Sequence, residues 1–504
     1  MSADPPETLR AALAASTRLD ARWLYGASAD VRLADLAASA CLDADLTGRS
    51  VLLRVADPLY AALALVALDG VARRIVLCPP DLTDEALPGV MATAGIEAIA
   101  FDESAPVEAA GLIAARIALP SPSSQAHHDP FPLAGKGQGM GVSAQAAKVG
   151  RGCKPANTEL APPPPPPPRR GEGSPKPTEW VMFTSGTSGP PKLVTHTLAG
   201  LTGAIRPSDD APIWGTFYDI RRYGGLQILL RALVGGGSLV VGAPAEPFAD
   251  YLTRAARLGV THLTGTPSHW RRALMSLESR ALNPAYVRLS GEIADQAVLD
   301  ALKARFPRAP IGHAYASTEA GVGFEVNDGL EGFPAEFVGR PGAVELKIVD
   351  GALALRSGRT AGGYLNTDAP ALDGADGFVD SGDMVELRGA RYHFVGRRNG
   401  VINVGGLKAH PEEIEAVINR HPAVRASLVK SRKSPITGAI AIADVVLADA
   451  GADEGAVRAE IIEACRRELA PFKTPAMIRF VAALPMTAGG KLDRAAAPKE
   501  TAVA

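Results

Sequence analysis

The chain has 504 residues, a formal net charge of −2 and an apolar fraction of 47%. This length predicts two or three domains, each large enough to bury its own core. The near-neutral charge excludes a broad electrostatic attraction to nucleic acid or to an anionic membrane.

No apolar stretch reaches the length of a membrane-spanning helix, so we expect no membrane span. The N-terminus, MSADPPETLR, lacks the basic and apolar segments of a secretory signal. The cysteines, none of them in a CxxC spacing, are expected to be reduced thiols of a cytoplasmic protein; they are Cys41, Cys78, Cys153 and Cys465.

The first regular pattern alternates strands and helices. Residues 51–55, 74–78 and 98–101 are short apolar runs typical of buried strands. Between them, residues 57–70, with Asp57 as a capping residue, and residues 82–94 are predicted helices. Strands that alternate with helices favour a parallel sheet covered by helices.

The pattern stops between about residues 120 and 177. Seven consecutive prolines, Pro162–Pro168, cannot donate backbone hydrogen bonds and favour an extended chain. Glycine- and serine-rich flanks favour flexibility, so we expect a disordered insertion. A ligand for an SH3-type domain is the weaker alternative. The GKGQGMG run does not follow a strand or precede a helix, which excludes a dinucleotide-binding loop.

Regular structure is predicted again from residue 179. EWVMF (179–183) is a strand, and further strands and helices are expected up to about residue 340. From Gly342 the pattern becomes β-rich, and a new strand and helix pattern follows Gly396. We therefore expect a large N-terminal domain, residues 1–396, and a C-terminal domain, residues 397–504, with a pivot at Asn399–Gly400.

A glycine-rich loop, TSGTSGPPK, directly follows the strand 179–183. Its glycines allow close backbone approach, its hydroxyls donate hydrogen bonds, and Lys192 supplies a mobile positive charge, as an anionic phosphate requires. The loop is not a Walker A motif, and an ordinary Ser/Gly loop is the alternative. The predicted ligands are Thr184, Ser185, Gly186, Thr187, Ser188, Gly189 and Lys192.

This loop resembles the signature of the adenylate-forming (AMP-binding, ANL-type) superfamily. Acyl-CoA synthetases, adenylation domains of peptide synthetases and beetle luciferases belong to it. Leu193 stands where glycine is usual after the lysine. The resemblance implies that the loop embraces the β- and γ-phosphates of ATP.

Two further motifs follow in the order of that family, GEIAD (291–295) and YASTEAG (315–321). An aromatic ring suits a purine face, and a carboxylate suits Mg2+ beside phosphate oxygens. In isolation, core packing would be the better interpretation of Tyr315, and a solvated charge that of Glu319. The resemblance implies that Gly291 and Glu292 border the adenine, that Tyr315 stacks on it, that Thr318 contacts the α-phosphate and that Glu319 holds Mg2+.

The C-terminal motifs complete the resemblance. GFVDSGD (377–383) implies that Asp383 binds the ribose hydroxyls, which a carboxylate can accept together. GRRNGVINVGGLKAHPEEIE (396–415) resembles the hinge segment, in which Arg397 would reach the ribose and Lys408 replaces a common arginine. LPMTAGGKLDR (484–494) places Lys491 as the catalytic lysine of the first half-reaction.

The resemblance implies an α/β fold: mainly parallel sheets with helices, a small β-rich subdomain, and a small mobile α+β C-terminal domain. It implies an ATP- and Mg2+-dependent ligase that forms an acyl-AMP and transfers the acyl group to coenzyme A. A small-molecule carboxylic acid is the expected partner. No nucleic-acid partner is expected. The alternatives are transfer to a separate carrier protein and an inactive nucleotide-binding homologue.

The acid is expected to bind between residues 214–225, 264–270 and 312–317. Trp214, Phe217, Tyr223 and Trp270 either line this pocket or pack in the core. Arg221 and Arg222 are expected at the surface, and pairing with a second carboxylate is the weaker alternative. His196 and His313 receive no role.

Overall fold

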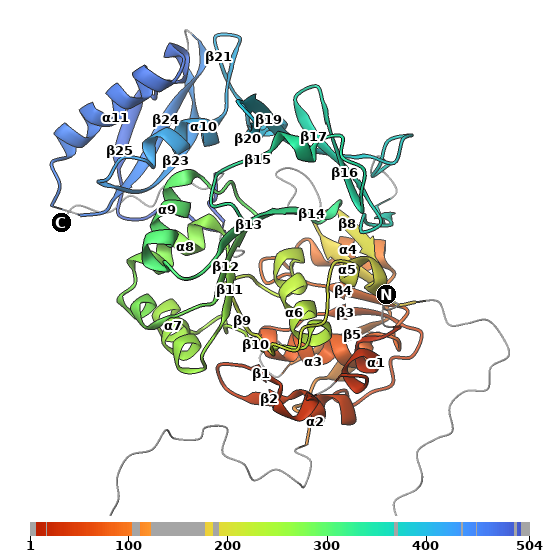
Figure 1. Cartoon of the computed structure of the whole chain (residues 1–504). Helices are drawn as coiled ribbons and strands as arrows, with labels where there is room; N and C mark the ends of the chain where they lie inside the picture. The colour runs from red at the N-terminus through yellow and green to blue at the C-terminus, as the bar shows by residue number, and fades with distance from the viewer. Residues whose placement is uncertain are drawn as a thin grey trace, which may run out of the picture. The chain divides into compact units, whose positions relative to one another are not determined.

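The computed structural model describes residues 7–16, 18–102, 111–121, 177–184, 191–366, 371–434, 437–449, 451–487 and 491–494 (Figure 1). Residues 122–176, which hold most of the predicted insertion and Cys153, lie outside the described residues. Within the described ranges four β-sheets form the fold. No helix in these ranges is both long enough and apolar enough to cross a bilayer.

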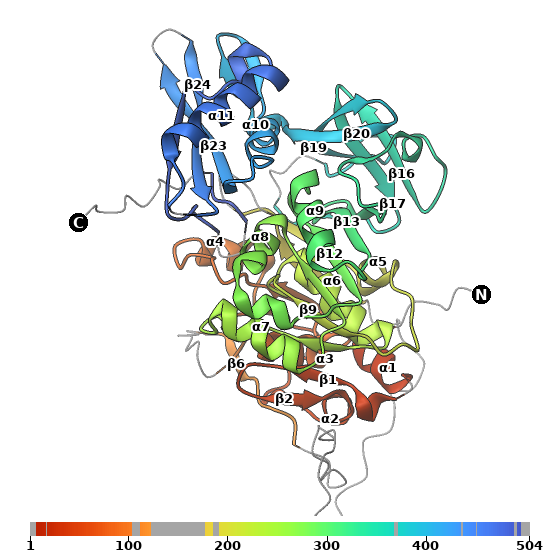
Figure 2. The ribbon, with the colours of Figure 1, turned by 60° about the vertical axis from the view of Figure 1, so that its left-hand side comes forward.

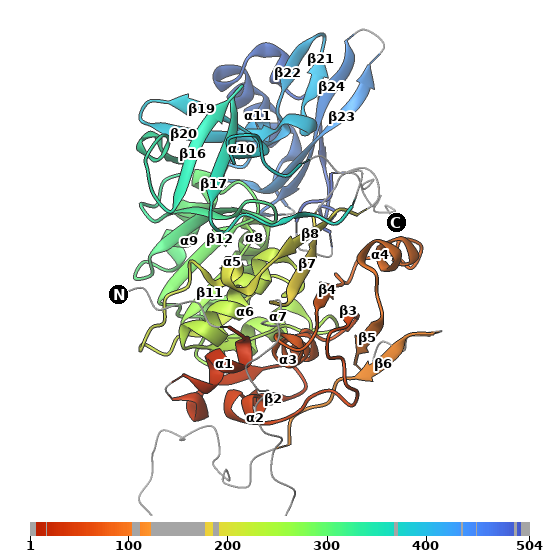
Figure 3. The same ribbon diagram turned by 90° about the vertical axis from the view of Figure 1, so that its right-hand side faces the viewer.

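The first sheet has seven strands and carries the base of the predicted phosphate loop (Figure 3). Its neighbouring strands β7, β4, β3, β5 and β6 are parallel, whereas β8 and β18 are antiparallel to their neighbours. In sheet order the strands are β18 (Gly363–Tyr364), β8 (Leu193–His196), β7 (Glu179–Phe183), β4 (Arg74–Leu77), β3 (Ser50–Leu53), β5 (Ala98–Phe101) and β6 (Ile113–Arg116).

Two helices connect the parallel strands of this sheet. Asp57 caps α3 (Pro58–Leu68), because its side chain accepts a hydrogen bond from the backbone N–H of Leu59. This cap confirms the predicted one. The second helix, α4 (Leu87–Ala94), begins later than the predicted residue 82. Pro88 lies in its first turn, where the missing N–H of proline costs least.

The second sheet has eight strands, with parallel neighbours from β13 through β1 and an antiparallel strand at each edge. Its order is β14 (Gly321–Val326), β13 (Ile311–Ser317), β12 (Tyr286–Ser290), β11 (His262–Gly265), β9 (Ile213–Thr216), β10 (Ser238–Val240), β1 (Trp23–Tyr25) and β2 (Asp30–Arg32).

Helices cover both faces of this sheet. On one face, α3 and α6 share a single apolar core with residues of both parallel sheets. The other face carries α7, α8 and α9 (Figure 2). Residues of these helices form a second core with β11 and β12. The remaining helices of this part are α1 (Leu9–Ala14), α2 (Leu33–Ala38), α5 (Leu198–Thr202), α6 (Tyr223–Gly235), α7 (Phe248–Arg257), α8 (Pro267–Met275) and α9 (Gln296–Arg305).

The predicted β-rich region forms a five-stranded antiparallel sheet with its own core. Its strands are β15 (Phe333–Pro334), β20 (Arg391–Arg397), β19 (Val379–Arg388), β17 (Ala352–Ser357) and β16 (Val344–Val349). Asp383 and Arg397 stand opposite each other on β19 and β20. This pairing brings two predicted nucleotide ligands together.

The C-terminal region forms a fourth sheet around a separate core. Its strands are β22 (Leu407–Ala409), β21 (Ile402–Val404), β24 (Gly438–Leu447), β23 (Val424–Ser434) and β25 (Met477–Phe480), and its helices are α10 (Pro411–Ile418) and α11 (Glu454–Glu468). Short 3-10 turns lie at Leu19–Ala21, Leu277–Ala281, Ala335–Phe337, Arg398–Gly400 and Pro471–Lys473. The boundary between residues 396 and 397 and the pivot at Asn399 remain proposals.

Candidate active site

The predicted phosphate loop connects β7 to β8. The two strands pair as far as Phe183 and Leu193, and the backbone N–H of Thr184 donates to the carbonyl of Lys192 at 3.1 Å. The hairpin ladder therefore holds Thr184 and Lys192 side by side. The predicted ligands Ser185, Gly186, Thr187, Ser188 and Gly189 lie outside the described residues.

A tyrosine that the motif analysis did not single out lies between two predicted site residues. The Lys192 ammonium is 5.3 Å from the ring centroid of Tyr364, within the range of a cation–π contact. Burial raises the pKa of Tyr364, and the hydrogen-bonded carboxylate of Glu319 raises it further. Lys192, Tyr364 and Glu319 therefore form one group, with a cation and a carboxylate on either side of a phenol.

Asn366 ties the phosphate hairpin to the segment that carries Tyr364. Its side-chain oxygen accepts from the backbone N–H of Leu193 at 2.7 Å, and its amide donates to the carbonyl of Pro191 at 3.3 Å. These backbone groups flank Lys192. Only the pairing of β18 with β8 shows what Asn366 contacts.

His196, which received no role from the motifs, connects β8 to Thr318, the residue predicted to contact the α-phosphate. Its Nε2 lies 2.8 Å from the carbonyl of Thr318, and only 3% of the residue is exposed. Burial lowers the pKa of His196 to about 4, so the ring is neutral at pH 7. Because a carbonyl only accepts, Nε2 carries the hydrogen. His196 thereby fixes Thr318 and the adjacent Glu319 relative to the phosphate hairpin.

The predicted adenine and ribose residues meet in a second group. The Tyr315 hydroxyl donates to Asp383 Oδ2 at 2.5 Å, and Arg397 Nε donates to Asp383 Oδ1 at 3.0 Å. The Tyr315 ring is parallel to Phe394, with centroids 5.2 Å apart, and also stacks with Phe324 at 5.5 Å. Burial, and then Asp383, raise the pKa of Tyr315, which keeps the phenol protonated as a donor.

The distant Lys491 reaches this group. Gly291 has φ +84°, and a Cβ added there would lie 3.4 Å from Lys491 Cε. Part of the side chain stays exposed, but protein surrounds the ammonium end and lowers the pKa of Lys491. Glu292 and Asp383 oppose this shift, and Arg222 and Arg397 add to it.

Glu292 also holds the backbone beside Lys491. Its carboxylate accepts from Ser268 N, at the start of α8, at 2.9 Å, and from Leu492 N at 3.1 Å. On the C-terminal side, Arg494 pairs with Glu415 of α10 through Nη1–Oε1 at 2.6 Å and Nη2–Oε2 at 2.8 Å. Two carboxylates, one on each side of the proposed pivot, thus anchor the chain just beyond Lys491.

Lys408 is not brought into the site. It is exposed on β22 and makes no hydrogen bond or ion pair with a residue that the structure describes. Its predicted role in nucleotide binding stays a prediction.

Several residues expected near the acid are instead buried in the core. Trp270 is fully buried, and Phe217 packs edge-on against it with ring centroids 5.4 Å apart, so these two rings fill the core. The expectation that Arg221 lies at the surface is wrong. Its guanidinium is buried in a two-bonded pair with Asp219, at 2.8 and 2.6 Å, which also occupies both Asp219 oxygens.

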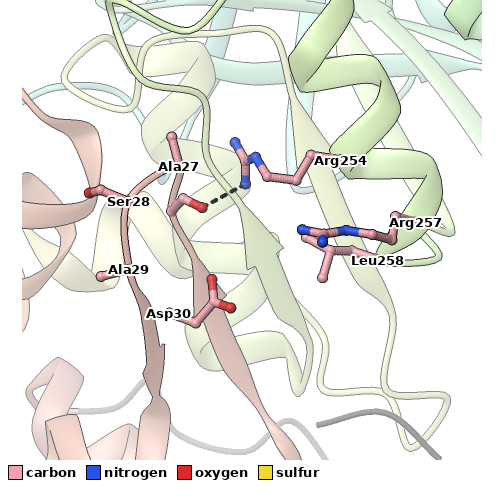
Figure 4. Close-up of a pocket in the computed structure, with 8 residues that line it drawn as sticks. Ala27, Ser28, Ala29, Asp30, Arg254, Arg257 and Leu258 are labelled. Atoms are coloured by element: carbon pink, nitrogen blue, oxygen red, sulfur yellow. Dashed lines mark hydrogen bonds between the residues drawn. The ribbon is translucent and has the colours of Figure 1, made fainter. Parts of the chain in front are cut away.

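A surface pocket of about 260 Å³ lies elsewhere, beside the turn before β2 (Figure 4). Arg254 crosses it and donates to the carbonyl of Gly26 at 2.9 Å. It is lined by Gly26, Ala27, Ser28, Ala29, Asp30, Arg254, Arg257 and Leu258 and includes no predicted site residue.

Comparison with protein families agrees with this geometry. Residues 46–367 match the family described as AMP-binding enzyme, and residues 413–491 match the AMP-binding enzyme C-terminal domain. The chain belongs to the AMP-binding enzyme family. The predicted membership of the adenylate-forming superfamily, the α/β fold class and the enzyme class, an AMP-forming acid–thiol ligase, are confirmed.

Individual relatives are distant. A 2-succinylbenzoate–CoA ligase of Listeria innocua is 29% identical over 336 residues, which cover 63% of this chain and 69% of that protein. Tyrocidine synthase 3 of Brevibacillus parabrevis is 27% identical over 69% of this chain and 6% of its own length. The structure resembles the Bacillus subtilis o-succinylbenzoate CoA synthetase in complex with its acyl-adenylate intermediate, with a TM-score of 0.67, 17% identity, and coverage of 99% of this chain and 100% of that one.

Proposed function

We propose that this AMP-binding enzyme activates a carboxylic acid with ATP and transfers the acyl group to the thiol of coenzyme A. In the first step a carboxylate oxygen bonds to the α-phosphorus, and pyrophosphate leaves. In the second step the thiol sulfur bonds to the acyl carbon, AMP leaves, and the thiol proton goes to solvent. The relatives named as CoA ligases support this sequence of steps.

The observation that carries the proposal is the position of Lys491. Its side chain lies against Gly291 and within electrostatic reach of Asp383 and Arg397. The substrate carboxylate and the α-phosphate repel each other, and a fixed cation between them offsets that repulsion. We assign this task to Lys491, and the β- and γ-phosphates to Lys192.

The other site residues act by position. Asp383 and Arg397, paired at 3.0 Å, would bind the ribose, and Tyr315 would present its ring to the purine. Thr318 and Glu319, fixed by His196, would face the α-phosphate. Holding the two anions in line supplies the entropic part of the rate enhancement.

The residues fit a magnesium ion held largely by phosphate oxygens. The described part of the chain has no cluster of three or more His, Cys, Asp or Glu side chains that could hold a metal ion by themselves. One carboxylate with substrate phosphates is a common arrangement for Mg2+. Glu319 is the residue that would hold the ion, which when bound would neutralise charge on the phosphate oxygens.

Pyrophosphate release with a panel of acids, with and without coenzyme A, tests the proposal. Lys491→Ala should abolish adenylate formation but spare thioester formation from supplied acyl-AMP. Equal loss of both steps would contradict the role of Lys491. Acyl transfer to a phosphopantetheinyl protein with weak use of free coenzyme A would favour carrier loading, as the similarity to tyrocidine synthase suggests.

A further inference from the structure

Helix α6 carries a guanidinium that is not hydrogen-bonded to any described carboxylate. Arg231 makes no hydrogen bond or ion pair with a described residue, and its Nε is buried without a partner. Burial, and then the neighbouring Arg288, lower the pKa of Arg231 to about 10. An unpaired cation in a desolvated position is costly, so a ligand is a reasonable source of the missing charge.

A second arginine adds to the positive charge. Arg288 on β12 is 8% exposed, and its Nη1 lies 3.1 Å from Glu325 Oε2. The other oxygen of Glu325 accepts from the Tyr286 hydroxyl. Glu325 is also the carboxylate that opposes the shift at Arg231. Two guanidiniums therefore share one carboxylate, which leaves one positive charge unbalanced.

The pair lies on the same strand as the reaction site. Side chains alternate along β12, so Arg288 and Ser290 share a face, while Val287 and Leu289 pack in the opposite core. Gly291, against Lys491, follows directly. Three residues of extended chain span roughly 10 Å, which sets the separation between Arg288 and the activated carboxylate.

This face has small residues next to Arg288, and the polar ends of Asn327 and Tyr286 lie over Gly312. Thr264 and Gly312 stand beside Arg288 on the adjacent strands, and both are small. The Tyr218 hydroxyl donates to the carbonyl of Ser290 at 2.9 Å, between Arg288 and Gly291. The strand thus leads from Lys491 past a phenol to the two guanidiniums.

We propose that Arg231 and Arg288 bind a second anionic group of the acid substrate, so that the preferred substrate is a dicarboxylic acid. This inference rests on the proposed function. A planar guanidinium can bind both oxygens of a carboxylate, and one added negative charge balances the cluster. The remote carboxylate would hold the acid while its other carboxylate faces Lys491.

Matched pairs of acids test the inference. We would measure pyrophosphate release with hexanoate against adipate, octanoate against suberate, and benzoate against phthalate. The wild type should prefer the longer dicarboxylates at least tenfold. Arg231→Met should lower kcat/KM for adipate and suberate by about 10- to 100-fold, the loss of one charge-assisted hydrogen bond, and leave the monocarboxylates unchanged.

Two variants control for charge and folding. Arg466→Met on α11 removes an exposed arginine far along the chain and should change neither class of acid. Arg231→Lys keeps the charge and should retain part of the preference. A wild type that prefers monocarboxylates, or an Arg231→Met variant that loses both classes equally at an unchanged unfolding temperature, would overturn the inference.

Failure of the proposed function gives a different result. If no acid releases pyrophosphate and ATP does not bind, the ligase proposal fails. Calorimetric titration of the wild type with adipate and hexanoate needs no catalysis and no variant. Binding of adipate alone would still support the anion site, and equal or absent binding would overturn it.

Discussion

The carboxylate of Glu292 accepts a hydrogen bond from the backbone N–H of Leu492 at 3.1 Å, one residue beyond Lys491. The bond joins the strand end that carries Gly291 to the C-terminal segment, so it exists only while Lys491 is in the site. Glu292→Ala should reduce adenylate formation by about 10- to 100-fold through loss of this charge-assisted bond. Thioester formation from supplied acyl-AMP should stay near the wild-type rate, as measured by coenzyme A consumption.

Glu292→Gln is the matched control for that change. An amide keeps one acceptor oxygen for the two N–H donors, Ser268 and Leu492, and turns the other into a donor. Its effect should fall between wild type and alanine. If both half-reactions slow equally in the alanine variant, Glu292 does not act through the C-terminal segment.

The pair of Arg494 with Glu415 predicts a stability effect in the C-terminal region. Arg494→Met leaves Glu415 buried without its counterion, at a cost of roughly 3–5 kcal/mol in the free energy of unfolding for a buried pair. The observed cost should lie at the low end because the Arg494 side chain is 33% exposed. Urea unfolding measures it.

Replacing both partners separates charge from packing. Arg494→Met with Glu415→Leu removes the uncompensated carboxylate and should recover part of the lost stability. Adenylate formation should stay low in both variants, because the anchor of Lys491 on α10 is absent from each. Full recovery of activity in the double variant would show that Lys491 needs no such anchor.

Asn366 should influence ATP binding although it lies far from the TSGTSGPPK loop in sequence. Asn366→Ala leaves Leu193 N without its acceptor beside Lys192, at a cost of about 1–3 kcal/mol. We expect weaker ATP binding by calorimetry. Asn366→Asp keeps the acceptor for Leu193 and loses only the donor to Pro191, so it should bind ATP better than the alanine variant. The reverse order would exclude this role.

His196 predicts a pH dependence of stability. Burial lowers its pKa from 6.5 to about 4. The unfolded chain therefore binds the proton more readily, and stability is present above pH 6.5 and is lost as the pH falls toward 4. Between pH 7.5 and 5.0 this group should cost about 2 kcal/mol, at 1.36 kcal/mol for each pH unit below 6.5.

His196→Gln isolates that contribution. The amide does not titrate but keeps a donor for the Thr318 carbonyl. The variant should lose about 2 kcal/mol less than wild type between the same two pH values in urea unfolding. His269, whose pKa burial also lowers to about 4, is present in both proteins and cancels in the comparison. Identical pH dependence in both would contradict the assignment.

Local patterns predicted most strands and helices because each depends on neighbouring residues. The strands at 98–101 and 179–183 have the predicted bounds, and α3 has its predicted cap. The motifs also identified Tyr315, Asp383 and Arg397, which the fold brings into contact. Each of these signals lies within a few residues of the chain.

Contacts between distant segments could not be predicted in this way. Tyr364 reaches Lys192 only because β18 pairs with β8 across some 170 residues of sequence, a pairing that no local period encodes. The burial of Arg221 likewise depends on Asp219 and on the carbonyl of Val55, far along the chain. An arginine pair next to glycines looks like a surface turn until the packing is known.

The ladder of β19 and β20 ends at Arg397, directly opposite Asp383, and the turn at Arg398–Gly400 starts one residue later. A torsional change at Asn399 would thus begin after the last paired residue. It would move Lys491 away and leave Asp383 and Arg397, the proposed ribose ligands, paired. Such an enzyme would replace the lysine by the thiol between the two half-reactions without releasing the adenylate.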